Sequence, residues 1–321
     1  MATQTIFPRM NAKAADKPKP KSDAKAKAKA AKDKAKGKKR KFGSVPTGDL
    51  APGRTAADFD KYELYGLSVQ EPEHEVEFFD ERFEERFGRK PTVLREDFCG
   101  TFGVCAEWVK LGDDRLALGV DLDPEPLDWG KKTRLPKLTK DQRKRLLLRK
   151  EDVRSLGKIH ADVIAAQNFS FFCFKTRKEL REYFEFAAAN LNKPGILIAD
   201  MMGGGECYTD DQEDVRKVGS GRKAFKYVWE TESFDPISHH CRMHIGFRFA
   251  DGTAKERTFT YDWRFWTLPE IRELMYEAGF RKVDVYWEGD DPDTDDGNGE
   301  FTRVESGTAD PAWICYVVAE K

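Results

Sequence analysis

Residues 93–103 read VLREDFCGTFG, an apolar strand that runs into a glycine-containing turn and the start of a helix. Gly100 and Gly103 let the backbone turn sharply, and the amide groups at the helix start can bind a polar or anionic group of a ligand. In an open α/β sheet, ligands bind at the carboxyl ends of the strands, usually at the first strand and its neighbour. The segment therefore predicts a strand-turn-helix unit with a ligand site at its turn.

Strands and helices alternate along the rest of the chain. A helix with apolar residues at helical spacing is predicted from Glu71 to Gly88, and the capping box Thr139-x-x-Gln142 marks another helix start. Further helices are predicted to begin at Val104 and Pro124 and to cover residues 177–191 and 268–280. The predicted strands cover residues 92–97, 116–121, 145–152, 162–167, 195–200, 282–287 and 312–320. This repetition predicts an α/β fold, a doubly wound Rossmann-like sheet of seven strands.

The rhythm changes between residues 206 and 266, where short alternating runs include RMHIGFRFADGTAKERTFTYDW. Asp251-Gly252 within this run is typical of a hairpin turn. We therefore expect an antiparallel insertion after the fifth strand, on the substrate side of the domain. The last two strands are expected to be joined by an acidic, glycine-containing loop over residues 288–311.

The N-terminal 42 residues are rich in Ala and Lys and carry thirteen Lys and two Arg against three Asp, a net charge of +12. Because the whole chain carries −1, the remainder carries −13. Such a segment has too few apolar groups to offset the entropy of ordering. We expect residues 1–55 to be a disordered tail and linker, and residues 56–321 to be the folded domain. Residues 1–42 are expected to contact nucleic acid or another polyanion weakly, or to be a solubilising or targeting extension.

The cysteine pattern and the hydropathy bear on the compartment. The six cysteines include no C-x-x-C pair, which indicates neither a zinc framework nor a small disulfide scaffold. No apolar run approaches the roughly 20 residues that span a bilayer, and the N-terminus lacks the apolar stretch of a secretory signal. We expect an intracellular protein without membrane contact, in the cytoplasm or, given the basic tail, in the nucleus.

Two further acidic residues follow predicted strands. Asp121 ends the second strand, in LALGVDLDP, where a carboxylate can accept both hydroxyls of a ribose. A dinucleotide and S-adenosylmethionine satisfy this equally, and a helix N-cap before Pro124 is the structural alternative. Asp152 follows the third strand, where it can accept an adenine amino hydrogen or cap a helix.

Together these segments resemble the class I S-adenosylmethionine-dependent methyltransferases, from about Leu94 to the C-terminus. The resemblance lies in EDFCGT (96–101), Asp121, Asp152 with Val153, AAQNFSF (165–171), AGFRKVDVYW (278–287) and AWICYVVA (312–319). It implies S-adenosylmethionine as cofactor, with Glu96 near the methionine ammonium, Cys99 and Gly100 in the turn, Thr101 opening the helix, Asp121 and Leu122 at the ribose, Asp152 and Val153 at the adenine, and Asn168 near the methyl group. Phe98 and Phe102 stand where the family usually has glycines, and the lack of a complete G-x-G-x-x-G argues against a nicotinamide enzyme.

The acceptor should approach residues 168–171, which read NFSF and are loosely similar to the N-P-P-Y type motif of enzymes that methylate planar amines. Asn168, Ser170 and Phe171 are candidates there; in the alternative, which we favour, Asn168 holds the cofactor and the phenylalanines are wall or core. Tyr208 is a candidate pocket residue, and Arg264 with Trp266 could bind an anionic or planar acceptor.

The insertion also contains SHHCRMH, residues 238–244. Extended backbone would place His240 and His244 on one face and His239 and Cys241 on the other, which divides the ligands of a zinc site. His240 or His244 could act as a general base, or both could be ordinary sheet residues. Methyl transfer itself requires no metal.

These observations predict an S-adenosylmethionine-dependent methyltransferase with a small-molecule or protein acceptor. A charge of −13 on the body disfavours bare nucleic acid at the catalytic face. The alternatives are a methyltransferase-like binding module that contacts nucleic acid through its basic tail without turnover, and a nucleotide-dependent oxidoreductase.

Overall fold

The structure, a computed structural model, describes residue 50 and residues 53–290 and 297–321. The chain divides into two units, Met1–Pro46 and Thr47–Lys321, and the fold described below is that of the second unit. The disordered tail and linker expected over residues 1–55 lies outside the described ranges except for residue 50 and residues 53–55, and the expected contact of residues 1–42 with polyanions lies outside them entirely. A domain boundary after residue 55 stays a prediction.

In the described part of the chain, eight strands form one sheet in the order β11-β10-β12-β5-β4-β1-β2-β3. The strands from β3 to β5 are mutually parallel, and β12 is antiparallel to both β5 and β10. Their bounds are β1 (Val93–Asp97), β2 (Leu116–Asp121), β3 (Leu146–Lys150), β4 (Ala161–Ala166), β5 (Leu191–Gly203), β10 (Lys282–Asp290), β11 (Gly297–Val304) and β12 (Trp313–Glu320). This is the predicted doubly wound α/β sheet, with the winding reversed between β1 and β4.

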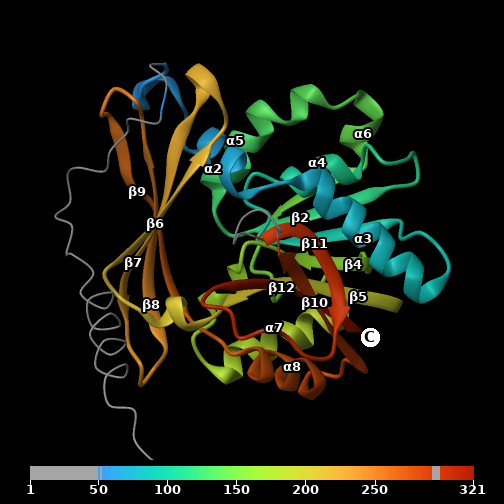
Figure 1. Cartoon of the computed structure of the whole chain (residues 1–321). Coiled ribbons are helices and arrows are strands. Elements are labelled where there is room, and N and C mark those ends of the chain that lie inside the picture. Colours follow the sequence, from blue (N-terminus) through green and yellow to red (C-terminus); the bar gives the residue numbers. More distant parts are fainter. Residues whose placement is uncertain (1–49, 51–52, 291–296) are drawn as a thin grey trace, which may run out of the picture. The chain divides into compact units, whose positions relative to one another are not determined.

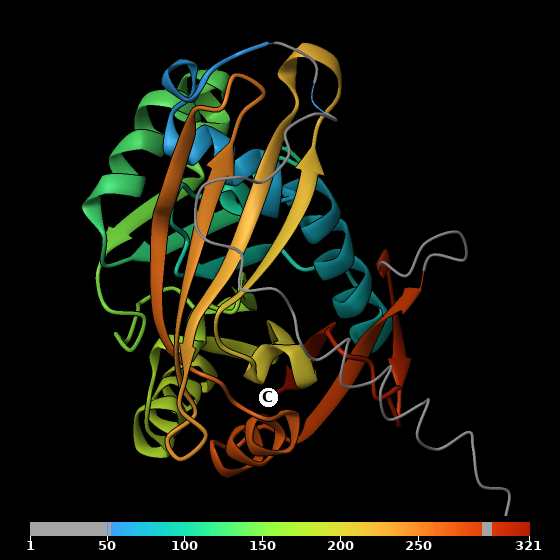
Figure 2. The same ribbon diagram turned by 60° about the vertical axis from the view of Figure 1, so that its left-hand side comes forward.

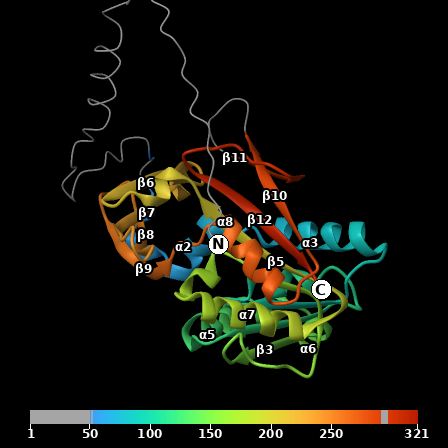
Figure 3. The same cartoon turned by 90° about the horizontal axis from the view of Figure 1, so that it is seen from below.

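Helices cover both faces of this sheet (Figures 1 and 3). Apolar side chains of α3, α4 and α5 form one buried cluster, and those of α7 and α8 belong to a second cluster on the opposite face. The helices are α2 (Lys61–Val69), α3 (Pro72–Phe87), α4 (Gly103–Trp108), α5 (Pro124–Thr133), α6 (Lys140–Lys144), α7 (Arg177–Asn190) and α8 (Leu268–Glu277), with short 3-10 helices at η1 (Ala56–Asp58), η2 (Leu135–Lys137), η3 (Ser170–Cys173), η4 (Gly205–Tyr208) and η5 (Gly221–Lys223).

Local sequence signals explain several of these boundaries. Helix α3 ends at Gly88, whose φ of 66° is left-handed and costs a glycine little. The side chains of Thr139 and Gln142 each accept a hydrogen bond from the other's backbone amide, which confirms the predicted capping box of α6. Asp123 caps α5 by accepting a hydrogen bond from the Glu125 amide. The cap therefore does not involve Asp121.

The insertion forms a second, antiparallel sheet in the order β6-β7-β8-β9 (Figure 2). Its strands are β6 (Gln212–Val218), β7 (Phe225–Phe234), β8 (His240–Arg248) and β9 (Ala254–Arg264). The hairpin between β8 and β9 turns at Gly252, whose φ is 84°. One face of this sheet packs against η3, because Phe172 contacts both Trp263 and Phe265. The insertion therefore stands beside the carboxyl ends of the parallel strands.

Two expectations about the C-terminal part need correction. The sheet has eight strands where seven were predicted, and residues 297–304 of the expected acidic loop form β11 at the sheet edge. Phe301 of β11 packs on Tyr316 of β12, with ring centroids 4.6 Å apart. Pairing with β10 and this aromatic contact outweigh the low strand propensity of an acidic, glycine-rich segment.

A search of the described helices finds none that is both long enough and apolar enough to cross a membrane.

Candidate functional site

The turn after β1 adopts left-handed backbone at three positions. Phe98 has a φ of 56°, Gly100 of 51° and Phe102 of 49°. A side chain in this conformation costs roughly 1–2 kcal/mol, so the two phenylalanines hold a geometry that glycine adopts more readily. Phe102 is fully buried, and a Cβ on Gly130 of α5 would lie 2.4 Å from its ring. The loop thus keeps a glycine-like path despite the two aromatic residues.

Asp121 anchors this turn at the end of β2. The Gly100 amide donates to its Oδ2 at 2.6 Å and the Asp123 amide to its Oδ1 at 2.8 Å. Asp121 is partly buried, and burial raises the pKa of its carboxyl group against the effect of the amide hydrogen bonds. Each oxygen keeps a further lone pair for the hydroxyl of a ligand. Leu122, directly beyond it, is 62% exposed.

The other predicted cofactor residues of this turn are buried. Cys99 and Thr101 are almost inaccessible, and the Glu96 Oε2 accepts a hydrogen bond from the Cys105 amide of α4 at 2.8 Å. Glu96 thereby ties β1 to the helix that follows it, and burial raises the pKa of its carboxyl group to about 7.

In the loop after β3, Asp152 pairs with the guanidinium of Arg154 at 2.8 Å and accepts the Arg154 amide hydrogen. These hydrogen bonds lower the pKa of Asp152. Val153 is buried, and its carbonyl accepts a hydrogen bond from Arg95 of β1 at 2.6 Å. The loop after β3 is therefore fixed to β1, with Asp152 at its surface rather than at the start of a helix.

Asn168 and Phe169 follow β4 in a second left-handed turn, with φ values of 57° and 56°. Both amides donate to the carboxylate of Asp200 in β5, at 2.7 Å and 2.9 Å. Asp200 is buried, and burial raises its pKa to about 7. The hydroxyl of Ser170 caps the same turn by donating to the Gln167 carbonyl. Asp200 therefore positions the loop that contains Asn168.

Four polar side chains, here called the polar cluster, are buried at these strand ends: Glu75 of α3, Glu96, Gln167 and Asp200. Burial and the charges of Glu96 and Asp200 raise the pKa of Glu75 to about 8. Among the described residues, the Glu75 Oε2 and both amide atoms of Gln167 have no hydrogen-bond partner. Sequence analysis missed Glu75, Gln167 and Asp200 as individual residues. The available signal was that Glu75 lies in the apolar stripe of Phe78 and Phe79, and that Asp200 ends the strand predicted over residues 195–200, as Asp121 ends the one predicted over residues 116–121.

Arg134 was also missed. Its guanidinium donates to the Thr101 hydroxyl at 3.1 Å, and a Cβ on Gly103 would lie 3.2 Å from it. Its Nε is buried without a partner within the described part of the chain. A cation over the start of α4 fits the carboxylate of an amino acid group, and Asp121 fits a ribose. The residues present thus suit S-adenosylmethionine.

The histidines of the insertion lie away from this edge of the sheet. His240 is exposed at the start of β8, and His244 contacts Glu232 at 3.0 Å and Thr260 at 2.9 Å. Neighbouring strand residues point to opposite faces, so His244 lies on the face opposite to Met243, which packs into the core. The structure does not bring His240 or His244 to Asn168.

The remaining acceptor candidates are dispersed. Phe171 and Trp266 are buried in the core, where the Trp266 indole donates to the Phe174 carbonyl. Arg264 stacks on the Trp266 ring and pairs with Glu270. Tyr208 is 38% exposed and packs on Phe234 and Phe265 of the insertion.

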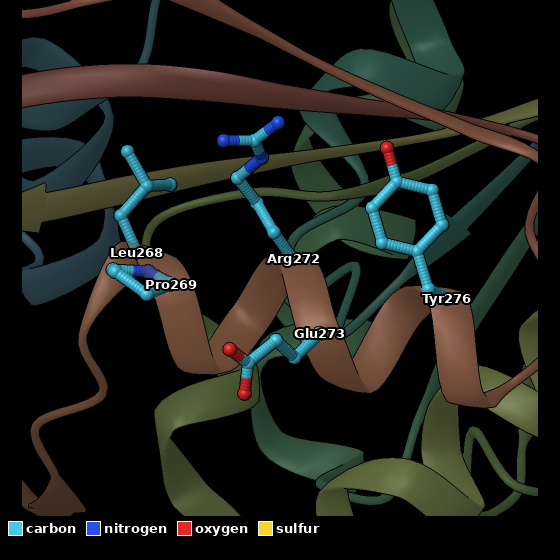
Figure 4. A pocket seen from close by; sticks show the side chains of 5 residues that line it. All are labelled: Leu268, Pro269, Arg272, Glu273 and Tyr276. Carbon is cyan, nitrogen blue, oxygen red and sulfur yellow. The ribbon is translucent and has the colours of Figure 1, made fainter.

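A depression of about 250 Å³ lies elsewhere, along α8. Leu268, Arg272 and Tyr276 rise from the same side of this helix (Figure 4). Pro269 and Glu273 complete its lining, and none of these residues belongs to the strand ends described above.

The raised pKa values of the polar cluster predict how stability depends on pH. The pKa of Glu75 is raised from an ordinary value of 4.5 to about 8. The pKa of Glu96 is raised from 4.5 to about 7, and that of Asp200 from 3.8 to about 7. Between its ordinary and its raised pKa, each group binds more protons in the folded protein than in the unfolded chain. The contribution of the three groups to the free energy of unfolding is therefore full below about pH 4 and is lost as the pH rises through 7 to 8. We expect the free energy of unfolding of the ligand-free protein, measured with urea, to be lower at pH 8.5 than at pH 6 by at least about 2 kcal/mol. Glu75→Gln should flatten this dependence, and equal stability at both pH values would contradict the assignment.

No protein-family model matches the sequence, and no curated protein matches it. Solved structures do match. CalS10, an amino pentose methyltransferase from Micromonospora echinaspora, is 18% identical with a TM-score of 0.57, and the match covers 82% of this chain and 97% of CalS10. An S-adenosylmethionine-dependent methyltransferase from Clostridium acetobutylicum is 17% identical with a TM-score of 0.56, over 81% and 96% of the two chains.

The sugar N-methyltransferase KedS8 from a Streptoalloteichus species is 16% identical with a TM-score of 0.54, over 88% of this chain and 98% of KedS8. At such low identities the likeness concerns the fold. It agrees with the strand order described above, in which β12 lies antiparallel between β5 and β10. The chain therefore has the α/β fold of the class I S-adenosylmethionine-dependent methyltransferases.

Proposed function

We propose that this protein is an S-adenosylmethionine-dependent methyltransferase that acts on a small-molecule or protein acceptor. The observation that carries the proposal is the junction of β1 and β2, where Asp121 accepts the Gly100 amide within a turn of three left-handed residues. A nucleoside with an amino acid group matches the carboxylate at the end of β2 and the guanidinium of Arg134. Solved methyltransferases of the same fold support this choice over a nicotinamide enzyme.

The cofactor, when bound, supplies an electrophilic methyl group. Asp121 would hold the ribose hydroxyls, Arg134 the methionine carboxylate, and Asp152 with Val153 the adenine. Glu96 and Asp200 keep the loops after β1 and β4 in place through backbone amides. The insertion packs over the β4 loop, which would help to exclude water and to align the acceptor.

Two of the structural neighbours are named for sugar acceptors, an amino pentose for CalS10 and a sugar nitrogen for KedS8. This supports a small molecule as the acceptor of the present chain. Contact of residues 1–42 with a polyanion remains a separate proposal.

Calorimetric titration of the full chain with S-adenosylhomocysteine tests the proposal, with NADH as the control ligand. We expect micromolar binding of S-adenosylhomocysteine and no heat from NADH. Absence of the first, or binding of the second, would contradict it.

A further inference from the structure

Unpartnered polar atoms point to a ligand at the polar cluster. Gln167 is 5% exposed and Glu75 is 7% exposed, yet three of their side-chain atoms have no hydrogen-bond partner among the described residues. Buried polar groups in native proteins are almost always paired, and unpaired ones are costly. Both residues lie at the carboxyl edge of the sheet, where α/β proteins bind their ligands.

The members of the cluster converge on one face of the sheet. Glu96, Gln167 and Asp200 each lie two residues beyond an apolar residue that packs under α3 and α4, namely Leu94, Ala165 and Ile198. Side chains two residues apart in a strand point the same way. Glu75 reaches this face from α3, because Phe78, one turn further along, stacks on Tyr316 at 4.5 Å. Tyr316 is directly opposite Asp200 in the sheet.

Glu75 and Asp200 have no counterion among the described residues, whereas the charge of Arg134 acts on Glu96 and opposes the effect of burial on its pKa. The principal electrostatic influences on Glu75 are the carboxylates of Glu96, Asp200 and Glu71, and those on Asp200 are backbone amides. Within the described part of the chain, neither set includes a basic side chain. A buried site of this kind favours a cationic ligand.

Aromatic residues of the insertion are connected to the cluster through Tyr65 and through Phe169, whose amide donates to Asp200. Trp229, Tyr261 and Trp263 form a row on the inner face of the second sheet, and Phe169, beside Asn168, packs edge-on against Trp263. Tyr65 of α2 hydrogen-bonds Tyr261, and the charges of Asp200 and Glu75 both raise the pKa of Tyr65. Such rings attract cations through their π faces.

We propose that the polar cluster is the acceptor site of the proposed methyltransferase and that the acceptor is an aliphatic amine. Gln167 and Glu75 hydrogen-bond its nitrogen, and the aromatic row covers its substituents. This inference rests on the proposed function and adds the substrate class. Two sources could present such an aliphatic amine to the site, a free small molecule and a lysine side chain.

The reaction follows from this placement. The acceptor arrives as an ammonium ion, and the ionised form of Glu75, which predominates above about pH 8, takes one proton and leaves a neutral amine; Glu75 later returns this proton to water. The nitrogen lone pair forms the new bond to the methyl carbon while the carbon–sulfur bond breaks, and the sulfur keeps that electron pair. The positive charge passes from sulfur to nitrogen, and the product leaves as a methylated ammonium ion. The raised pKa of Glu75 brings it closer to that of an amine, which favours the proton transfer.

The test uses S-adenosylmethionine with a tritiated methyl group and the full chain. Three acceptor mixtures are compared: free alkylamines, amino sugars and amino acids; the same mixture after N-acetylation; and lysine-containing peptides. We expect label in the free amines or in the peptides, which separates the two sources, and none after acetylation. Glu75→Gln should lower kcat/KM about 100-fold or more while leaving the affinity for S-adenosylhomocysteine within about threefold. Glu77→Gln, an exposed glutamate on the same helix, is the matched control.

Several results would overturn the proposal. The first is that a protein that binds S-adenosylhomocysteine transfers no label to any amine. The second is that the acetylated mixture receives as much label as the free amines, and the third is that Glu75→Gln keeps full activity. Loss of S-adenosylhomocysteine affinity in Glu75→Gln would assign the glutamate to the cofactor ammonium and overturn it as well. A wild-type protein that does not bind S-adenosylhomocysteine would refute the proposed function itself.

Thermal unfolding of the ligand-free protein provides a readout besides activity. Gln167→Leu removes two unpartnered buried atoms, so we expect it to raise the unfolding midpoint by about 2–4 °C while lowering methyl transfer. A drop in the midpoint would mean that Gln167 supports the fold rather than a ligand, and would contradict its place in the acceptor site.

Discussion

Asp121→Asn lowers the affinity for S-adenosylhomocysteine at least about 100-fold in our account. The carboxylate is expected to accept two ribose hydroxyls, and each hydrogen bond to a charged group contributes about 1.5–3 kcal/mol. Two such bonds correspond to a factor of about 100 to 10,000 in affinity. In the wild type, the Gly100 and Asp123 amides each donate to a different carboxylate oxygen of Asp121. Asparagine keeps only one accepting oxygen for this turn. Its amide nitrogen cannot accept a hydroxyl.

Calorimetry on the wild type, Asp121→Asn and Asp128→Asn measures this effect. Asp128 is an exposed residue of α5 that pairs with Lys131, so its replacement should leave the affinity unchanged. Near-ultraviolet circular dichroism of each variant checks that the fold is kept. An affinity of Asp121→Asn within threefold of the wild type would contradict the assignment of Asp121 to the ribose.

Arg95→Met should destabilise the protein by about 3–5 kcal/mol. Arg95 and Asp97 lie side by side in β1, both buried, with the Nε of Arg95 2.6 Å from the Asp97 Oδ1. Tyr183 of α7 donates its hydroxyl to the same carboxylate at 3.2 Å. Methionine would leave Asp97 as a buried charge without a counterion and would free the loop after β3 from the Arg95 guanidinium. The loss is large against a typical stability of about 5–15 kcal/mol.

Urea unfolding of a short variant series measures this loss. Arg95→Met with Asp97→Asn should recover most of the stability, because it removes the unpaired charge and keeps an acceptor for Tyr183. Arg149→Met, at an exposed position of β3, should change stability by less than about 0.5 kcal/mol. A cost of Arg95→Met below about 1 kcal/mol would show that the pair of Arg95 and Asp97 does not hold the loop after β3.

The parallel core could be predicted from the sequence because its signals are local. Strands β1 and β2 each end in an acid, and the turn between β1 and α4 contains Gly100. These features, with the resemblance to a known family, led to Glu96, Asp121 and Asp152. Strand β11 was missed because GNGEFTRV has few apolar residues, and its extended form depends on pairing with β10.

The polar cluster could not be predicted, because its members gain their meaning from packing. Glu75 lies in a helix rich in acids, and only the contact of α3 with the sheet distinguishes it from exposed Glu77. Asp200 lies in β5 and Gln167 directly follows β4, so the two residues are 33 positions apart in sequence and become neighbours through the parallel pairing of β4 with β5. The left-handed backbone of Phe98 and Phe102 is likewise a property of the folded turn, since phenylalanine has no local preference for it.

The histidines show the opposite case, in which a conspicuous motif has an ordinary place. Alternation along the strand, as expected, separates His244 from Cys241, and the structure adds that His244 bonds Glu232 and Thr260. A pattern of reactive residue types in a strand indicates chemistry only when the face that they share also faces the ligand.

A crystal structure of the protein grown with S-adenosylhomocysteine would show whether the cofactor binds at the turn after β1. We predict density for the nucleoside at the carboxyl ends of β1 and β2, with both ribose hydroxyls within hydrogen-bond distance of Asp121 and the amino acid group near Arg134. Density at another place, such as the depression along α8, or none at the ends of β1 and β2 at saturating ligand, would contradict it.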